Sequence, residues 1–127
     1  MDWKYKLRTP KKIKNSRIIE DATIIVASKQ ISEGLDNVLK QVKDDISLSP
    51  DMRTWLTEQL EERKEDFDFL IGLENISVNE RSSDYQIDSM TDAYNDYMSA
   101  LYDLADSHIT TVSDVEYKLL WIEPYTV

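Results

Sequence analysis

The sequence predicts a mostly helical protein: four or five helices in a small bundle, with a short β element at the N- or C-terminus as an open alternative. The chain has 127 residues and 41% hydrophobic content, which is enough for one buried core. Its two glycines and three prolines are too few for a sandwich or barrel of many short strands. Three stretches also repeat apolar residues at helical spacing.

The N-terminal residues 1–17 are expected to form a basic extended arm, and residues 18–127 an acidic helical domain. Pro10 and the lysines that follow it disfavour a helix in the arm. Within the arm, "WKYKL" alternates aromatic or apolar residues with basic ones, and this alternation is typical of a short strand.

Residues 17–32 fit two kinds of element. The β-branched run "IIV" at 24–26 favours a strand. Ile18, Ala22 and Ile25 instead follow helical spacing. A helix is preferred, because no partner strand is apparent nearby in the sequence.

Two clearer helices follow. The first covers "SEGLDNVLKQVKDDIS" and places its apolar residues on one side. The second begins with Ser49 as N-cap and Pro50 in the first helical position, and Asp51 suits the positive end of the helix dipole. Gly72 is placed to end this helix. Its charged middle, "EQLEERKEDFD", is expected to stand in solvent.

The C-terminal part predicts a helix over 84–106 and a short last helix over 114–122. Ser113 and Glu116 have the spacing of a capping box, which supports that last helix. A strand is the alternative, because apolar and polar residues alternate through "VEYKLLW".

The charge of the chain is divided unevenly. Residues 1–17 hold seven bases and one acid, and residues 18–127 hold eight bases and twenty-four acids, so +6 stands against −16. The seven bases of the arm are Lys4, Lys6, Arg8, Lys11, Lys12, Lys14 and Arg17. Such asymmetry bears on binding partners rather than on the fold.

Aspartates form a stripe on the helix predicted over 84–106. Its members are Asp84, Asp88, Asp92, Asp96, Asp103 and Asp106, and no Lys or Arg occurs between Arg81 and Lys118. On a helical wheel the stripe lies nearly opposite the apolar residues, so it is expected to face away from the core. Like charges four residues apart disfavour a helix, and three such pairs cost about 1 kcal/mol.

Three interpretations of the stripe compete. It is the ordinary surface of an acidic protein, or it binds a basic partner, or it binds a divalent metal ion. Hard cations need six to eight oxygens that converge from a loop, whereas a straight helix spreads its carboxylates along a line. No metal is therefore expected, and no cofactor is expected because the sequence holds no cofactor motif.

The preferred hypothesis is a non-enzymatic module that binds the basic surface of another protein, as an inhibitor or nucleic-acid mimic of the kind that viruses and mobile elements encode. The alternative is an assembly or connector subunit that forms a homo-oligomer through its arm. Trp3 and Tyr5 among bases also suit nucleic acid, but a body of −16 repels it, so nucleic acid is not the expected partner.

No motif in the sequence names a reaction. The chain has no cysteine, and its one histidine, His108, is expected to cap the end of a helix rather than to act in catalysis. Trp55 and Trp121 are expected in the core. No membrane contact is expected, because no apolar run approaches the roughly 18 residues of a membrane span, and a cytoplasmic protein is the simplest interpretation.

Overall fold

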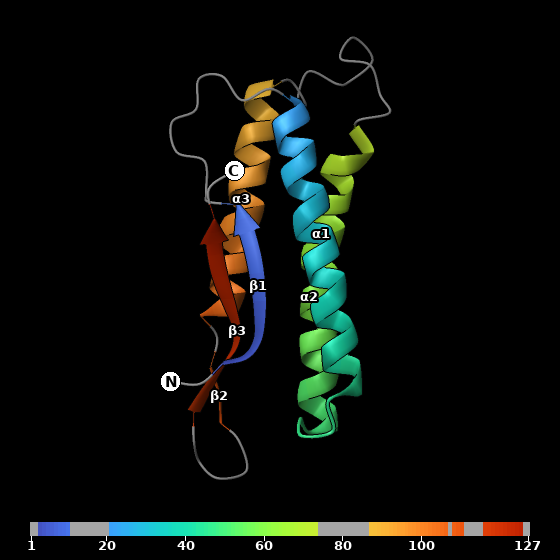
Figure 1. Ribbon diagram of the computed structural model, residues 1–127, viewed down its shortest axis with the longest axis vertical. Helices are drawn as coiled ribbons and strands as arrows, with labels where there is room; N and C mark the ends of the chain where they lie inside the picture. The colour runs from blue at the N-terminus through green and yellow to red at the C-terminus, as the bar shows by residue number, and fades with distance from the viewer. Residues whose placement is uncertain (1–2, 11–20, 74–86, 107, 111–115, 126–127) are drawn as a thin grey trace.

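The computed structural model describes residues 3–10, 21–73, 87–106, 108–110 and 116–125 (Figure 1). Its elements are β1 (Trp3–Pro10), α1 (Asp21–Asp44), α2 (Pro50–Gly72), α3 (Ile87–Ala105), β2 (His108–Thr110) and β3 (Glu116–Tyr125). The protein is mostly helical, as predicted. The expectation of four or five helices is wrong for the described residues, which form three.

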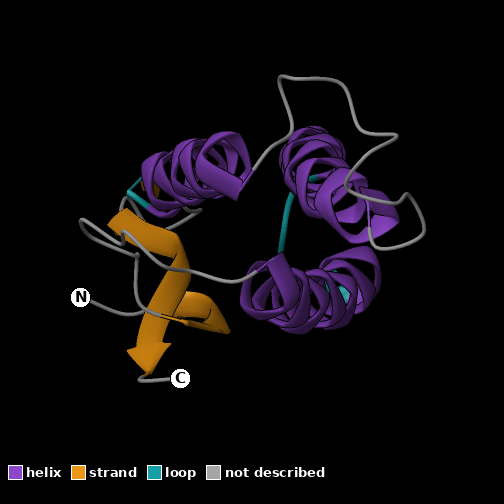
Figure 2. Ribbon diagram, turned by 90° about the horizontal axis from the view of Figure 1, so that it is seen from above, coloured by secondary structure: helices purple, strands orange, loops and turns teal. Residues whose placement is uncertain are grey.

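The three helices pack against one another, and the sheet covers one side of them. Figure 2 shows the helices at the corners of a triangle, with the strands against the side that α1 and α3 make. Accordingly α1 packs against α2, α3 and β1, and α3 packs against β3. The sheet has the order β1-β3-β2, with β1 parallel and β2 antiparallel to β3.

A single helix, α1, replaces the two elements expected between residues 17 and 46. The preference for helix over strand at the "IIV" run is confirmed, but the expected boundary between two elements at Ser32 is wrong, because α1 runs through it. A tertiary contact explains why a glycine occupies position 34, because a Cβ there would lie 2.5 Å from Cδ1 of Leu7. Gly34 thus lets β1 approach the middle of α1 closely.

The last helix expected over 114–122 is wrong, because residues 116–122 belong to the strand β3, which runs on to Tyr125. The strand alternative is confirmed, but the buried residues are not those of the predicted alternation. Leu120 and Ile122 are buried, whereas Trp121, which was expected in the core, and Glu123 are partly exposed. The strand is stabilised by parallel pairing with β1, in which Tyr5 lies opposite Leu120. Ser113, the predicted N-cap residue, lies outside the described residues.

Strand β1 confirms the strand expected within "WKYKL" and extends it to Pro10. Tyr5 and Leu7 point into the core, and Lys6 and Arg8 alternate with them on the exposed side. The Tyr5 hydroxyl donates a hydrogen bond of 2.5 Å to Oδ2 of Asp45, just after α1. This bond ties β1 to the turn between α1 and α2.

Helix α2 begins and ends where the sequence predicts. The Ser49 hydroxyl accepts a hydrogen bond of 3.2 Å from the Met52 amide, and Gly72 is the last helical residue. The expectation that the middle of α2 stands in solvent is only partly right, because Leu60 and Phe67 are fully buried there.

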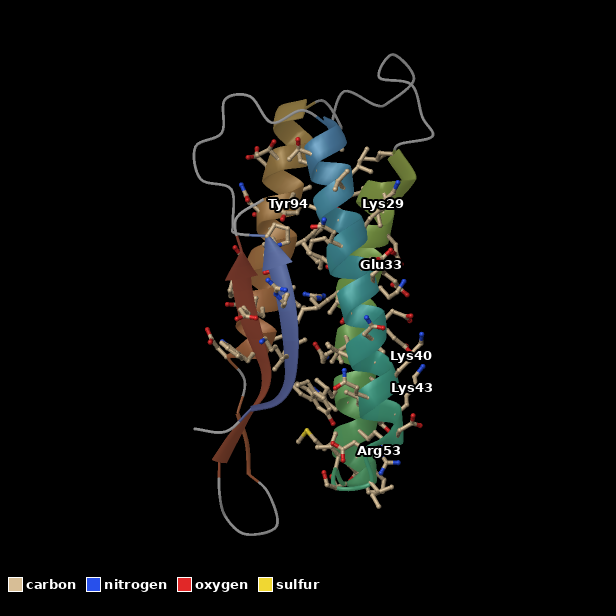
Figure 3. All side chains as sticks on the ribbon, in the orientation of Figure 1. Lys29, Glu33, Lys40, Lys43, Arg53 and Tyr94 are labelled. Atoms are coloured by element: carbon tan, nitrogen blue, oxygen red, sulfur yellow. The ribbon has the colours of Figure 1, made fainter. Side chains whose placement is uncertain are left out.

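The predicted core side of α3 is confirmed for the side chains that the structure describes. Met90, Tyr94, Met98 and Leu101 are fully buried. Tyr94, labelled on α3 in Figure 3, forms an edge-to-face contact with Phe67 of α2, with 6.2 Å between the ring centres. Within the described ranges, no helix combines the length and apolarity needed to cross a bilayer.

Candidate functional site

The outer side of α3 is acidic. Asp92, Asp96, Asp103 and Asp106 are all exposed, on the side of the helix opposite its buried residues. We call these four residues the α3 acidic face. Asp88 belongs to α3, but its side chain is not described, and Asp84 lies outside the described residues. Of the 19 residues of α3, four are aspartates and none is Lys or Arg.

Acids on the other helices are partly matched by bases. Lys40 pairs with Asp36 at 3.3 Å, and Lys43 of α1 reaches Glu61 of α2 at 3.8 Å. Figure 3 shows Lys29, Glu33, Lys40 and Lys43 in succession down α1, so this helix presents both signs of charge. Among the described residues, Asp92 and Asp96 form no ion pair.

Helix α2 also carries exposed acids. Glu58 and Glu62 are exposed, and on a helical wheel both fall within about 60° of Trp55. The pKa of Asp66 on α2 also reflects the acids around it. Burial raises the pKa of its carboxyl, Arg63 opposes that rise, and the neighbours Glu62 and Glu65 add to it.

A groove of about 270 Å³ lies between the first half of α2 and the C-terminal end of α3. Its lining residues are Trp55, Gln59, Arg63, Ala100, Asp103 and Leu104. The expectation that Trp55 serves the core is wrong, because this side chain is 37% exposed. It occupies the first turns of α2, where α1 and the sheet do not cover it.

The cation in this groove is already neutralised. Arg63 lies 3.8 Å from an oxygen of Glu62 and 3.6 Å from an oxygen of Asp66. Two carboxylates therefore share one guanidinium, and the net charge around the groove stays negative.

The described part of the basic arm folds onto its own chain. Lys6 pairs with Glu123 of β3 at 2.8 Å, and Arg8 approaches the same oxygen at 3.5 Å. The hydrogen bond from Lys6 is the main cause of a lowered pKa for the Glu123 carboxyl. Lys6 also lies 5.0 Å from the ring centre of Trp121. Lys4 belongs to β1 without a described side chain, and the remaining bases, Lys11, Lys12, Lys14 and Arg17, lie outside the described residues.

A second groove, of about 400 Å³, lies between β1 and α1. Its lining residues are Lys6, Leu7, Arg8, Gln30, Glu33, Gly34, Asn37 and Gln41. Its two bases are the same ones that pair with Glu123, so their charge is partly compensated. Compared with the α2–α3 groove, this surface is mixed in charge and rich in amides.

Two polar contacts that the sequence does not reveal join the elements. Tyr5 bonds to Asp45, as described above. Ser32 of α1 donates a hydrogen bond of 2.5 Å to Asp68 of α2, and Lys64 lies 2.8 Å from the other oxygen of that carboxylate. Burial alone would raise the pKa of Asp68, but the bonds from Lys64 and Ser32 outweigh it and lower that pKa. Both contacts position elements rather than reacting groups.

The described residues contain no arrangement for metal chemistry, because no three His, Asp or Glu side chains converge among them. His108 opens the strand β2 two residues after α3 and its turn, and its side chain is not described. Its expected capping role therefore stays a prediction.

Comparisons of the chain with protein-family models, with curated proteins and with solved structures found no match.

Proposed function

We propose that this chain is a non-enzymatic acidic module that binds a basic surface of another protein, as an inhibitor or nucleic-acid mimic. The observation that carries the proposal is the exposure of Asp92 and Asp96 on a helix without a base, where they form no ion pair within the described part of the chain. A cytoplasmic location belongs to the same proposal and is supported by the absence of cysteine.

The spacing of these carboxylates suits a basic partner. A step of four residues advances about 6 Å along a helix axis, so the acidic face offers charges at regular intervals on a rigid rod. Lys and Arg side chains that bind phosphates also bind carboxylates through charge-assisted hydrogen bonds. A surface that binds nucleic acid is therefore chemically suited to the α3 acidic face.

The unfavourable local energetics support the same proposal. Aspartates four residues apart repel each other, and Asp is a poorer helix former than Glu. A binding role gives this arrangement a compensating interaction, because a basic partner would remove the repulsion.

An assembly subunit that oligomerises through the arm is supported less well. Lys6 and Arg8 already pair with Glu123 of their own chain, and Tyr5 and Leu7 are buried in their own core. Exchange of this segment between subunits would have to replace all of these contacts.

The test compares two double variants that remove the same amount of charge. Asp92→Asn/Asp96→Asn changes the α3 acidic face, and Glu33→Gln/Asp44→Asn changes exposed acids of α1. Proteins retained by the wild-type chain from a lysate of its source would be identified by mass spectrometry and purified. Their Kd values would then be measured by calorimetry at low and at physiological salt.

The face variant is expected to weaken binding by about 2 kcal/mol, or roughly thirtyfold in Kd, because it loses two interfacial ion pairs. The α1 variant is expected to bind as the wild type does, and duplex DNA is expected to displace the chain from its partner. Equal losses in both variants would show that only net charge matters, and the proposal would then be abandoned.

A further inference from the structure

The geometry points to the α2–α3 groove as a subsite that takes one arginine side chain of a basic partner, stacked on Trp55 and paired with Asp103. This inference rests on the proposed function and adds the kind of side chain that the partner supplies. It goes beyond the α3 acidic face, because it assigns a role to an aromatic residue on a different helix.

Trp55 supplies the first observation. Its side chain is 37% exposed, although α2 has a buried side that holds Leu56 and Leu60 next to it. Within the described residues its ring forms no contact with another ring or with a cation. A tryptophan face in this state is the best aromatic surface for a guanidinium, which stacks on it through its plane.

The charge around the groove supplies the second observation. Asp103 lines the groove, and Asp92 and Asp96 fall within about 20° of it on the wheel of α3. On the α2 side, Glu58 and Glu62 flank Trp55. Among the described residues that line the groove, the one base is Arg63, and its guanidinium pairs with Glu62 and Asp66. An incoming cation is therefore attracted, whereas an incoming anion meets acids from two helices.

The size and lining of the groove favour arginine over a larger group. A volume of about 270 Å³ accommodates one long side chain but not a helix. The small side chain of Ala100 leaves space on the α3 side of the groove, and Leu104 gives an apolar surface for the methylene groups of arginine. The Gln59 amide offers an acceptor beside Trp55, so several of the N–H groups of arginine find partners.

The experiment uses hexa-arginine and hexa-lysine peptides, which carry equal charge, as probes of the full chain. Calorimetry at physiological salt would give the ratio of their Kd values. The arginine peptide is expected to bind roughly threefold to tenfold tighter, because stacking on Trp55 adds to the attraction of the acids. In a Trp3→Phe/Trp121→Phe background, that peptide should also quench the remaining tryptophan fluorescence.

Variants separate the groove from the acidic face. Trp55→Leu removes the stacking surface, and Ala100→Leu fills the groove. Each variant is expected to abolish the preference for arginine. Asp92→Asn/Asp96→Asn should weaken both peptides and leave the ratio unchanged. Circular dichroism and thermal unfolding would check that each variant folds. If one groove variant does not fold, the other still tests the arginine subsite.

The outcomes distinguish the two proposals. A ratio near one in the wild-type chain, or a ratio unaffected by both groove variants, overturns the arginine subsite and leaves the acidic module standing. Binding of both peptides that is unaffected by Asp92→Asn/Asp96→Asn overturns the acidic module. Self-association of the chain without peptide, measured by light scattering and lost in Trp55→Leu, would assign the groove to a second copy and overturn the subsite.

Discussion

The close approach of Leu7 to Gly34 predicts a strong coupling between these two residues. Gly34→Ala should stabilise α1 by about 1 kcal/mol through helix propensity. The new Cβ, however, would lie 2.5 Å from Cδ1 of Leu7, which is only 1% exposed, so one of the two groups must shift. Overpacking of this kind costs about 1–3 kcal/mol, so the single variant should range from neutral to about 2 kcal/mol less stable.

Leu7→Ala removes the side chain that the new Cβ would meet, so in this background Gly34→Ala should change from destabilising to stabilising. The truncation itself should cost about 2–5 kcal/mol, because Leu7 is fully packed. In this background Gly34→Ala should stabilise the protein by about 1 kcal/mol, which gives a coupling free energy of about 1–3 kcal/mol between the two sites. Urea unfolding of the wild type, both single variants and the double variant, followed by circular dichroism, measures this cycle. Additive effects would refute the packing of β1 against the middle of α1.

Three further predictions concern the caps and polar contacts. Ser49→Ala should lower the free energy of unfolding by about 1 kcal/mol in urea titrations, because α2 loses its N-cap, whereas Ser49→Asp should retain most of it. Burial, and then the hydrogen bond to Asp45, raise the pKa of Tyr5 above its usual value of 10.0. The unfolded chain therefore loses this proton first, so stability should fall as the pH rises past about 10, and Tyr5→Phe should make that fall shallower. Ser32→Ala should cost about 1 kcal/mol in unfolding experiments at neutral pH. It should also raise the pKa of Asp68 in NMR titrations, which brings that pKa closer to its value in the unfolded chain. The protein should then lose less stability as the pH falls below about 4, where the carboxyl of the unfolded chain protonates.

Features set by local sequence could be predicted. The exposed aspartates and the buried Met90, Tyr94 and Met98 of α3 follow from helical periodicity alone, and the cap at Ser49 follows from a short motif. These signals lie within one or two turns of the residues that they determine, so no knowledge of distant partners is needed.

Features set by distant contacts could not be predicted. The capping-box spacing that ends at Glu116 is a local signal for a helix, but pairing with β1 at the other end of the chain overrides it. Likewise, the close approach of Leu7 to Gly34 joins two residues far apart in the chain, so no local pattern announces it. The groove with Trp55 needs two helices in register, and nothing in the linear pattern of α2 distinguishes this tryptophan from a core residue.

The parallel ladder between β1 and β3 has a consequence for biosynthesis. During translation the first strand leaves the ribosome long before its hydrogen-bonding partner is made. In the part of the chain that the structure describes, β2 pairs with β3 and not with β1, so it does not take the place of β3. Until then Tyr5 and Leu7 can rest only on the nascent α1–α2 hairpin. Completion of the sheet is therefore expected to be a late, slow step that closes most of the chain into one loop.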